Sequence, residues 1–478
     1  MSAPRRVLAV LFFGVLIAAL DIAIVGPALP ALQDAFDVDR RTIAWVFNVF
    51  VLANLVSIPL MSRLADRFGR RTLFTADVLL FGLGATIVGS ATSFPMLLVG
   101  RGVQGMAAAG IFPAASAVVG DTFAPEKHGR ALGVLGAVYG VAFVIGPIFA
   151  GIVLSVASWS WLFWLSAPLA LLVAGLGWVV LPATAAPGDE PLDVGGMATI
   201  GVLLAALAYG VNQIDTQAVM ASLLRPEVGL ALLLAAALVP VFIRIERRVA
   251  DPLLRLELFT SRQVQIASAL AAGAGLTEAA FIFFPDLAVA AFGVADATAS
   301  FMLLPLVIAV AIASPVAGRV LDRVGSRPIV LTGALLLAAG FAVMGAVPAD
   351  RVAFYGGSIA IGFGLACLLG SSLSYILLRE SSAAERTVAQ GVIALFLGIG
   401  QLLGGAIIGA VAESGPSGVA GYAQAFLLIA GIAGGLALLA TRLKGRAAEQ
   451  EAAVAVGDSQ PANDPASGPY ERSKEENK

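Results

Sequence analysis

Apolar stretches of about 20 residues follow one another through nearly the whole chain. A helix of about 20 apolar residues crosses the hydrocarbon core of a bilayer. The sequence as a whole is 59% hydrophobic and only 13% charged, which excludes an ordinary soluble domain. It therefore predicts an all-α integral membrane protein with fourteen transmembrane helices, near residues 7–29, 43–61, 73–92, 95–119, 131–155, 160–182, 195–213, 228–245, 265–285, 298–317, 328–347, 353–377, 387–411 and 420–441.

A short basic loop occurs twice, each time between two apolar stretches. The first copy runs from Ser62 to Arg71 and the second from Gly318 to Arg327. A charged loop between two spans must lie in water at the membrane surface. Its repetition predicts two related halves. Five residues recur at identical offsets: Arg63/Arg319, Asp66/Asp322, Arg67/Arg323, Gly69/Gly325 and Arg71/Arg327.

Polar segments divide the chain further. We expect an N-terminal six-helix bundle over residues 1–183, a linker with two extra transmembrane helices over 184–262, and a C-terminal six-helix bundle over 263–446. Residues 447–478 are rich in Glu, Pro, Ser and Asn, so we expect a disordered cytoplasmic tail.

The distribution of basic residues predicts the orientation. If the N-terminus lies inside, 21 arginines and lysines fall at the inner ends of the spans, and only Arg40, Arg41, Arg225 and Arg351 fall at the outer ends. Loops on the inner side of a membrane carry the excess of basic residues. The chain is therefore expected to cross the cell membrane many times, with both termini inside.

Composition also limits the chemistry. The chain has only one cysteine, Cys367, and one histidine, His128. Because these residue types are the usual ligands of zinc and iron, a site for either metal is not expected. No span carries a nucleophile–base pair, so we do not expect an enzyme. The net charge of −2 gives no reason to expect a nucleic-acid partner.

Charge inside a bilayer is costly, so intramembrane ionisable residues are candidates for function. Asp21 lies 15 residues past Arg6, and Arg101 lies early in the descending fourth span. At 1.5 Å per residue, both are about 8–9 Å below the outer surface. They can therefore pair, or they can compete for protons and substrate. The alternative is a structural ion pair that holds the N-terminal half together.

Glu278 is the counterpart in the second half. It lies 16 residues past Arg262, and no basic residue occurs within the apolar part of any C-terminal span. Burial without a cationic partner disfavours the charged form of a carboxylic acid, which can then keep its proton near neutrality. A proton-coupling site needs that property. The alternative is a carboxyl that faces a water-filled vestibule without a coupling role.

Other residues are expected to support these carboxyls. Asp77 and Asp121 lie near the inner surface, where they can balance the charge of the first basic loop.

The fifth span is rich in small residues, which favour close helix packing and a seam between two moving halves. Its motif residues are Gly133, Gly146, Pro147 and Gly151, with Gly136 and Gly140 on one face. Residues that could line a cavity are Asn48, Gln104, Tyr139, Phe281, Gln390 and Gln401.

These motifs resemble those of the major facilitator superfamily. The basic loop resembles the signature G-x-L-a-D-r-x-G-r-(R/K), with Ser62 at the first position of copy one and Gly318 at that of copy two. Leu97-x3-Arg101-x2-Gln104-Gly105 resembles the fourth-span motif. The segment from Leu20 to Pro30 resembles the first-span motif of the fourteen-span drug:proton antiporters, and Gly133 to Gly151 resembles their fifth-span motif.

The resemblance implies the fold and an activity. It implies two six-helix bundles plus two central linker helices, and proton-coupled efflux of drugs or other amphipathic small molecules by alternating access. Asp21 and Glu278 would respond to protons, and Arg101 would modulate them. The coupling ion would be the proton, with no other cofactor and no metal. The protein would work as a monomer among membrane lipids.

The resemblance also assigns a gating role to the two basic loops. Asp66 and Arg67 would latch neighbouring helices in the outward-open state and release them in the other. The gating residues are Asp66, Arg67, Gly69, Arg70 and Arg71 in the first loop, and Gly318, Asp322, Arg323, Gly325 and Arg327 in the second.

Two alternatives remain open at this stage. One is a lipid or metabolite exporter or facilitator of the same fold without proton antiport. The other is a non-transporting membrane scaffold, against which the repeated gating loop argues.

Overall fold

The computed structural model describes residues 3–38, 40–43, 45–183, 193–214, 218–249, 252, 256–294, 296–382, 386–414, 418–449 and 451. The first half contains α1 (Ala3–Phe36), α2 (Arg40–Ile43), α3 (Trp45–Phe68), α4 (Arg70–Gly89), α5 (Phe94–Thr122), η1 (Pro125–Lys127), α6 (His128–Val156), α7 (Ser160–Trp164) and α8 (Ser166–Val180). The middle contains α9 (Val194–Asn212), α10 (Val219–Leu223), α11 (Pro226–Glu246) and η2 (Leu256–Thr260).

The second half repeats the helical pattern of the first. It contains α12 (Arg262–Glu278), η3 (Ala279–Phe283), α13 (Phe284–Phe292), α14 (Asp296–Phe301), α15 (Leu304–Val324), α16 (Ser326–Ala346), α17 (Arg351–Cys367), η4 (Leu368–Ser372), α18 (Leu373–Glu380), α19 (Arg386–Ser414) and α20 (Val419–Ala440). Each basic loop joins two long helices, α3 to α4 and α15 to α16, through a glycine with positive φ, Gly69 (87°) or Gly325 (84°).

Twelve helices in the described part of the chain are long and apolar enough to cross a membrane. Two shorter apolar helices, Gly195–Val211 and Arg351–Cys367, occupy two further positions where the sequence predicts spans. The second is short because a π-helical turn, Leu368–Ser372, separates α17 from α18. The all-helical membrane architecture is thus confirmed.

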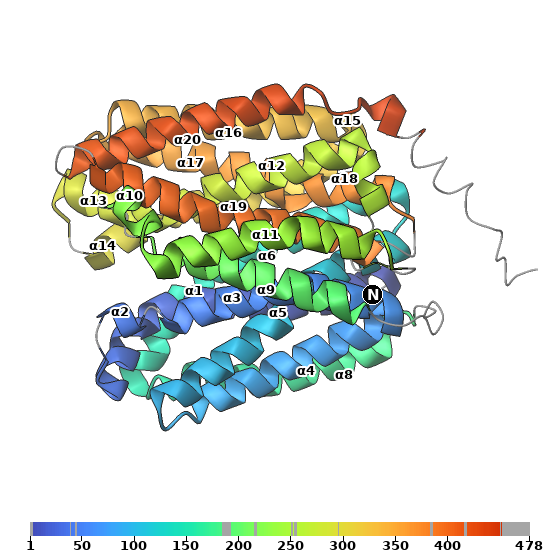
Figure 1. Cartoon of the computed structure of the whole chain (residues 1–478), viewed down its shortest axis with the longest axis horizontal. Coiled ribbons are helices and arrows are strands. Elements are labelled where there is room, and N and C mark those ends of the chain that lie inside the picture. The colour runs from blue at the N-terminus through green and yellow to red at the C-terminus, as the bar shows by residue number, and fades with distance from the viewer. Residues whose placement is uncertain are drawn as a thin grey trace, which may run out of the picture.

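The long helices run side by side, with the N-terminal helices in one part of the bundle and the C-terminal helices in the other (Figure 1). The linker helices α9 and α11 pack on each other, and α9 also contacts α3 and α19, one helix from each half. The core of the C-terminal half contains a cluster of four phenylalanines, in which Phe284 contacts Phe341, Phe354 and Phe426 with ring centroids 5.2–6.2 Å apart.

The two halves meet along two seams of small residues. In the first, α6 packs on α15: a Cβ atom added at Gly133 would lie 2.6 Å from the carbonyl oxygen of Ser314, and one added at Gly140 would lie 2.7 Å from Cα of Ala311. In the second, α19 packs on α3, and a Cβ atom at Gly398 would lie 2.8 Å from Leu55. Small residues let backbones approach closely where no hydrophobic effect drives helices together.

The α6–α15 seam gives a direct test of this packing. We expect Gly133→Leu to lower the free energy of unfolding by about 1–3 kcal/mol, because the new side chain must push the Ser314 backbone away. Gly151→Leu is the matched control on the same helix, since nothing lies within 4 Å of a Cβ atom there. Unfolding in detergent measures both, and equal losses in the two variants would show that the seam is not tightly packed.

Candidate functional site

Asp21, Arg101 and Gln104 form a closed polar triad inside the N-terminal half. Arg101 and Gln104 lie three residues apart on one face of α5, and Asp21 faces them from α1. The Arg101 guanidinium forms an ion pair with the Asp21 carboxylate and donates to the Gln104 side-chain oxygen at 2.9 Å. The Gln104 amide donates to the other Asp21 oxygen at 2.7 Å. Of the two possibilities that the sequence left open, pairing of Asp21 with Arg101 is the one found in this conformation.

Further contacts hold the side chain of Arg101 in place. Its Nε donates to the carbonyl oxygen of Val46 at 3.0 Å, and its guanidinium lies 4.5 Å from the centre of the Phe50 ring. The side chains of Asp21 and Arg101 are both 0% exposed. Removing one partner of a buried pair leaves an uncompensated charge, so the triad holds α1, α3 and α5 together.

Glu278 lies in a different setting, in the second half of the chain. It is half-buried at the end of α12 and accepts a hydrogen bond from the Gln401 amide of α19 at 2.9 Å. Tyr139 of α6, which is 37% exposed, interacts with it electrostatically from the first half. Phe281 is half-buried one turn further on and packs on Phe284 with ring centroids 5.5 Å apart.

Two of the predicted cavity residues are placed differently. Gln104 is fully buried in the triad, and Gln390 is 2% exposed and donates from its amide to the carbonyl oxygen of Ser374 at 3.0 Å. Neither lines a cavity in this conformation, because packing against neighbouring helices encloses both. Asn48, by contrast, is half-buried on α3.

The end of the bundle that carries the two basic loops, here called the basic-loop end, is held closed by polar contacts between the halves. Asp121 at the end of α5 pairs with Arg70 of the first loop, as expected, and also with Arg386 of α19 at 2.6 Å. Arg379 of α18 donates to the carbonyl oxygen of Pro125 at 3.0 Å.

The second loop contacts the opposite half through a helix N-terminus. The Asp322 carboxylate accepts hydrogen bonds from the backbone N–H groups of Gly129 and Arg130, at 2.8 and 2.9 Å. An acidic side chain is favourable there because free N–H groups and the helix dipole attract negative charge. The backbones also touch, since a Cβ atom at Gly318 would overlap Gly129.

The remaining predicted gating residues lie at the surface or against aromatic rings. The Arg67 guanidinium lies 5.5 Å from the Phe68 ring centre, and that of Arg71 lies 4.7 Å from the Trp178 ring centre. Arg323 and Arg327 are exposed. The side chain of Asp66 lies outside the described residues, so its expected latch contact stays a prediction.

The predictions for Asp77 and for the fifth-span motif have different outcomes. Asp77 forms no ion pair with the first basic loop among the described residues. It is 2% exposed, and it packs so closely on Gly110 that a Cβ atom there would overlap its carboxylate. In the fifth-span motif, Gly146 packs on Ala23 of α1, and Gly151 faces open space. The side chain of Pro147 lies outside the described residues.

Glu449 makes a contact that the sequence reasoning missed. It follows the last long helix, is 4% exposed, and accepts hydrogen bonds from the backbone N–H and the hydroxyl of Ser326. Ser326 begins α16 and corresponds to Arg70 in the first copy of the loop. An acidic residue therefore binds the equivalent position in both copies, Asp121 in one and Glu449 in the other. The run of helix-forming residues from Arg446 to Glu451 is the sequence feature that could have predicted a helical turn here.

The family follows from comparison with known sequences. The model of the Major Facilitator Superfamily matches residues 11–289 and again residues 266–466. This chain belongs to the Major Facilitator Superfamily. It is a multi-pass transporter of the cell membrane and not an enzyme, as the sequence predicts.

Relatives in this superfamily carry transporter names. The chain is 33% identical over 395 residues to the MFS-type transporter YfiU of Bacillus subtilis, covering 82% of this chain and 76% of that one. It is 27% identical over 412 residues to the multidrug transporter MdtP of Bacillus subtilis, covering 84% and 74%. It is 30% identical over 424 residues to the puromycin resistance protein pur8 of Streptomyces alboniger, covering 84% and 80%.

A solved structure supports the fold. The human organic anion transporter MFSD10 matches with a TM-score of 0.69 at 16% identity, covering 91% of this chain and 99% of that one. The arrangement of two related helical halves is therefore that of the superfamily.

The buried triad predicts strong coupling between its members. We expect Asp21→Asn or Arg101→Gln alone to lower the free energy of unfolding by about 3–5 kcal/mol, because each leaves a buried charge unpaired. The double variant should lose less than the sum of the two. The Lys444–Glu380 pair is the control, with smaller coupling expected because Lys444 is 36% exposed. Additive losses at Asp21 and Arg101 would refute the coupling.

Glu449 predicts a pH dependence at the basic-loop end. Burial raises the pKa of this carboxyl above its ordinary value, with Arg379 and Glu380 of α18 as charged neighbours. A raised folded-state pKa means that the docked segment contributes most below the ordinary pKa and less as pH rises through the folded-state value. Between about pH 5 and pH 8, the melting temperature of the wild type should fall relative to that of Glu449→Gln.

The control for this prediction is Glu451→Gln, which changes an exposed carboxyl on the same segment. Its melting temperature should change with pH in the same way as that of the wild type. A wild type that runs parallel to Glu449→Gln over the whole range would contradict a protonation-dependent contact.

Proposed function

We propose that this transporter exports drugs or other amphipathic small molecules in exchange for protons, and that Glu278 is the main coupling carboxyl. The observation that supports this proposal is the surroundings of Glu278: it accepts a hydrogen bond from Gln401 of its own half, and Tyr139 of the first half is an electrostatic neighbour. The electrostatic surroundings of Glu278 would change if the halves rock, since Tyr139 belongs to the other half. A carboxyl whose surroundings change can bind a proton in one state and release it in the other.

Asp21 has a supporting role in this proposal. Its described partners all lie in the N-terminal half, so rigid rocking of the halves leaves the triad intact. In this conformation the Asp21 carboxylate is paired with the Arg101 guanidinium. It responds to protons only if the ion pair opens, and Arg101 then modulates that response.

The substrate class rests on the relatives' names and on the surfaces available. Two relatives are named for multidrug transport and puromycin resistance. The Glu278 neighbourhood offers an aromatic phenol, a phenylalanine, an amide and one carboxyl. Apolar surface with few polar groups suits amphipathic compounds. In this proposal the proton is the only coupling ion, and the protein works as a monomer.

The membrane arrangement is part of the same proposal. We assign fourteen spans, counting the two shorter apolar helices as α9 and as the α17–α18 pair. Both termini and the basic-loop end face the cytoplasm. The contacts of Asp121 and Asp322 across the halves then describe a state closed to the cytoplasm, and access from that side requires these contacts to break.

Substrate-linked proton flux in proteoliposomes tests the proposal. Purified protein would be offered lipophilic cations, neutral drugs and lipids under an imposed pH gradient. We expect wild type to couple substrate flux to proton flux, and Glu278→Gln to lose gradient-driven transport at least tenfold, because its side chain cannot ionise. Asp21→Asn should be impaired in both transport and stability.

Glu227→Gln is the matched control, because Glu227 is an exposed carboxyl in the first turn of α11. It should transport like wild type. Transport that ignores the gradient, or coupling that survives Glu278→Gln, would instead favour a facilitator or a lipid or metabolite exporter. No transport of any compound by folded wild type would favour a scaffold.

A further inference from the structure

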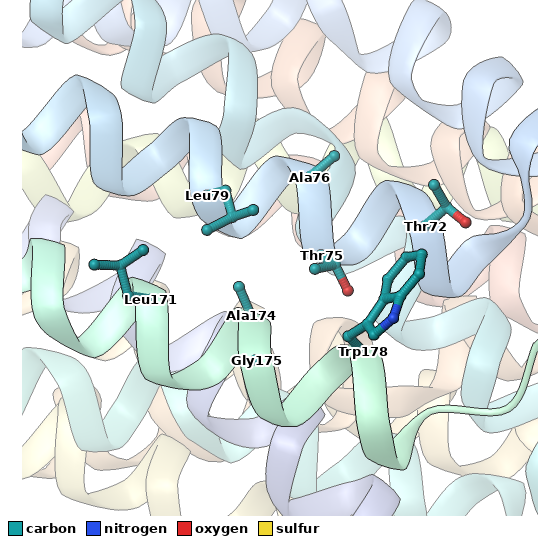
Figure 2. Close-up of a pocket in the computed structure, with 8 residues that line it drawn as sticks. All are labelled: Thr72, Thr75, Ala76, Leu79, Leu171, Ala174, Gly175 and Trp178. Atoms are coloured by element: carbon teal, nitrogen blue, oxygen red, sulfur yellow. The ribbon is translucent and has the colours of Figure 1, made fainter.

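A groove between α4 and α8 lies away from the seam between the halves. It has a volume of about 550 Å³. It opens on the periphery of the N-terminal half, away from the other half, where Leu171 is 65% and Trp178 52% exposed. Figure 2 shows Leu79 and Leu171 at one end of the groove, and Thr72, Thr75 and Trp178 at the other. In a membrane protein, this face is covered by lipid.

The groove is amphipathic along its length. Its apolar end extends toward mid-membrane, since Leu79 lies seven residues along α4 from Thr72, about 10 Å at 1.5 Å per residue. Its polar end lies beside the first basic loop, with the hydroxyls of Thr72 and Thr75. Thr75 is 7% exposed, and its hydroxyl has no hydrogen-bond partner in the described part of the chain.

A cation stands at the polar end. The Arg71 guanidinium lies over the Trp178 ring, and its buried Nε has no hydrogen-bond partner among the described residues. The neighbouring carboxylate of Asp121 is engaged by Arg70 and Arg386. Arg71 therefore keeps donors for a ligand, and a tryptophan at this level is typical of the membrane–water interface.

We infer that this groove binds one anionic phospholipid from the leaflet at the basic-loop end. An acyl chain lies between Leu79 and Leu171, over Gly175, and the phosphate accepts hydrogen bonds from Arg71. Gly175 leaves this path open, because nothing lies within 4 Å of a Cβ atom there. A charged headgroup beside an apolar chain fits the polar-to-apolar order of the groove. The inference does not depend on the proposed proton coupling.

Native mass spectrometry of protein purified from vesicles of phosphatidylcholine with phosphatidylglycerol tests the inference. Wild type should retain one phosphatidylglycerol in preference to phosphatidylcholine. Gly175→Leu should lower that retention at least tenfold, because the new side chain fills the acyl path. Arg71→Gln should abolish the preference for the anionic lipid while leaving some lipid bound.

Matched controls separate the groove from general effects. Gly435→Leu changes an exposed glycine of α20 that also has nothing within 4 Å. Arg351→Gln removes an arginine that lies 5.6 Å from a different ring, Phe292. Both should retain phosphatidylglycerol like wild type, and both should melt normally.

Two results would overturn the inference. One is equal retention of the two lipids by wild type. The other is unchanged phosphatidylglycerol retention in a folded Gly175→Leu variant; if that variant also lost drug transport, the groove would be a path for the transported compound. Loss of coupling in Glu278→Gln with normal lipid retention would leave the two proposals independent.

Discussion

The cost of an uncompensated charge in a low-dielectric interior shapes this protein. Only a few ionisable side chains lie within the spans. Two of them, Asp21 and Arg101, form an ion pair, and Gln104 hydrogen-bonds to both. Such a triad contributes little net stability over apolar packing, yet it cannot lose a member without a large penalty. It therefore fixes the arrangement of α1, α3 and α5 as one unit.

The carboxyl of Glu278, unlike that of Asp21, does not rely on an ion pair within the described part of the chain. Its described hydrogen-bond partner is the neutral amide of Gln401, and its electrostatic neighbour Tyr139 belongs to the other half. Removing one partner of a buried ion pair carries a large penalty, whereas the contact of Glu278 with a neutral amide involves no such pair. The two carboxyls therefore differ in their partners: Asp21 pairs with a cation inside one bundle, and Glu278 contacts a neutral amide.

The seams and the basic-loop end show how two halves stay joined yet remain separable. Glycines bring α6 against α15 by backbone contact, which involves no hydrophobic effect within a bilayer. Asp121 and Asp322 add charge-assisted contacts at the water-exposed end, where such contacts break more easily than in the membrane interior. Glu449, which follows α20, adds a buried carboxyl contact to the second loop.

Sequence by itself determined the helical membrane fold, the two related halves and the common depth of Asp21 and Arg101. These features follow from local quantities: the length of apolar runs, a repeated loop and the helical rise per residue. Only the tertiary structure decided that Gln104 and Gln390 are buried, that Asp77 packs on Gly110, and that Glu449 binds Ser326. It also decided that Arg71 stands over Trp178 beside an open groove. Each of these depends on which faces of distant helices meet, and a periodic apolar pattern cannot specify that, because in a membrane lipid and protein surfaces are equally apolar.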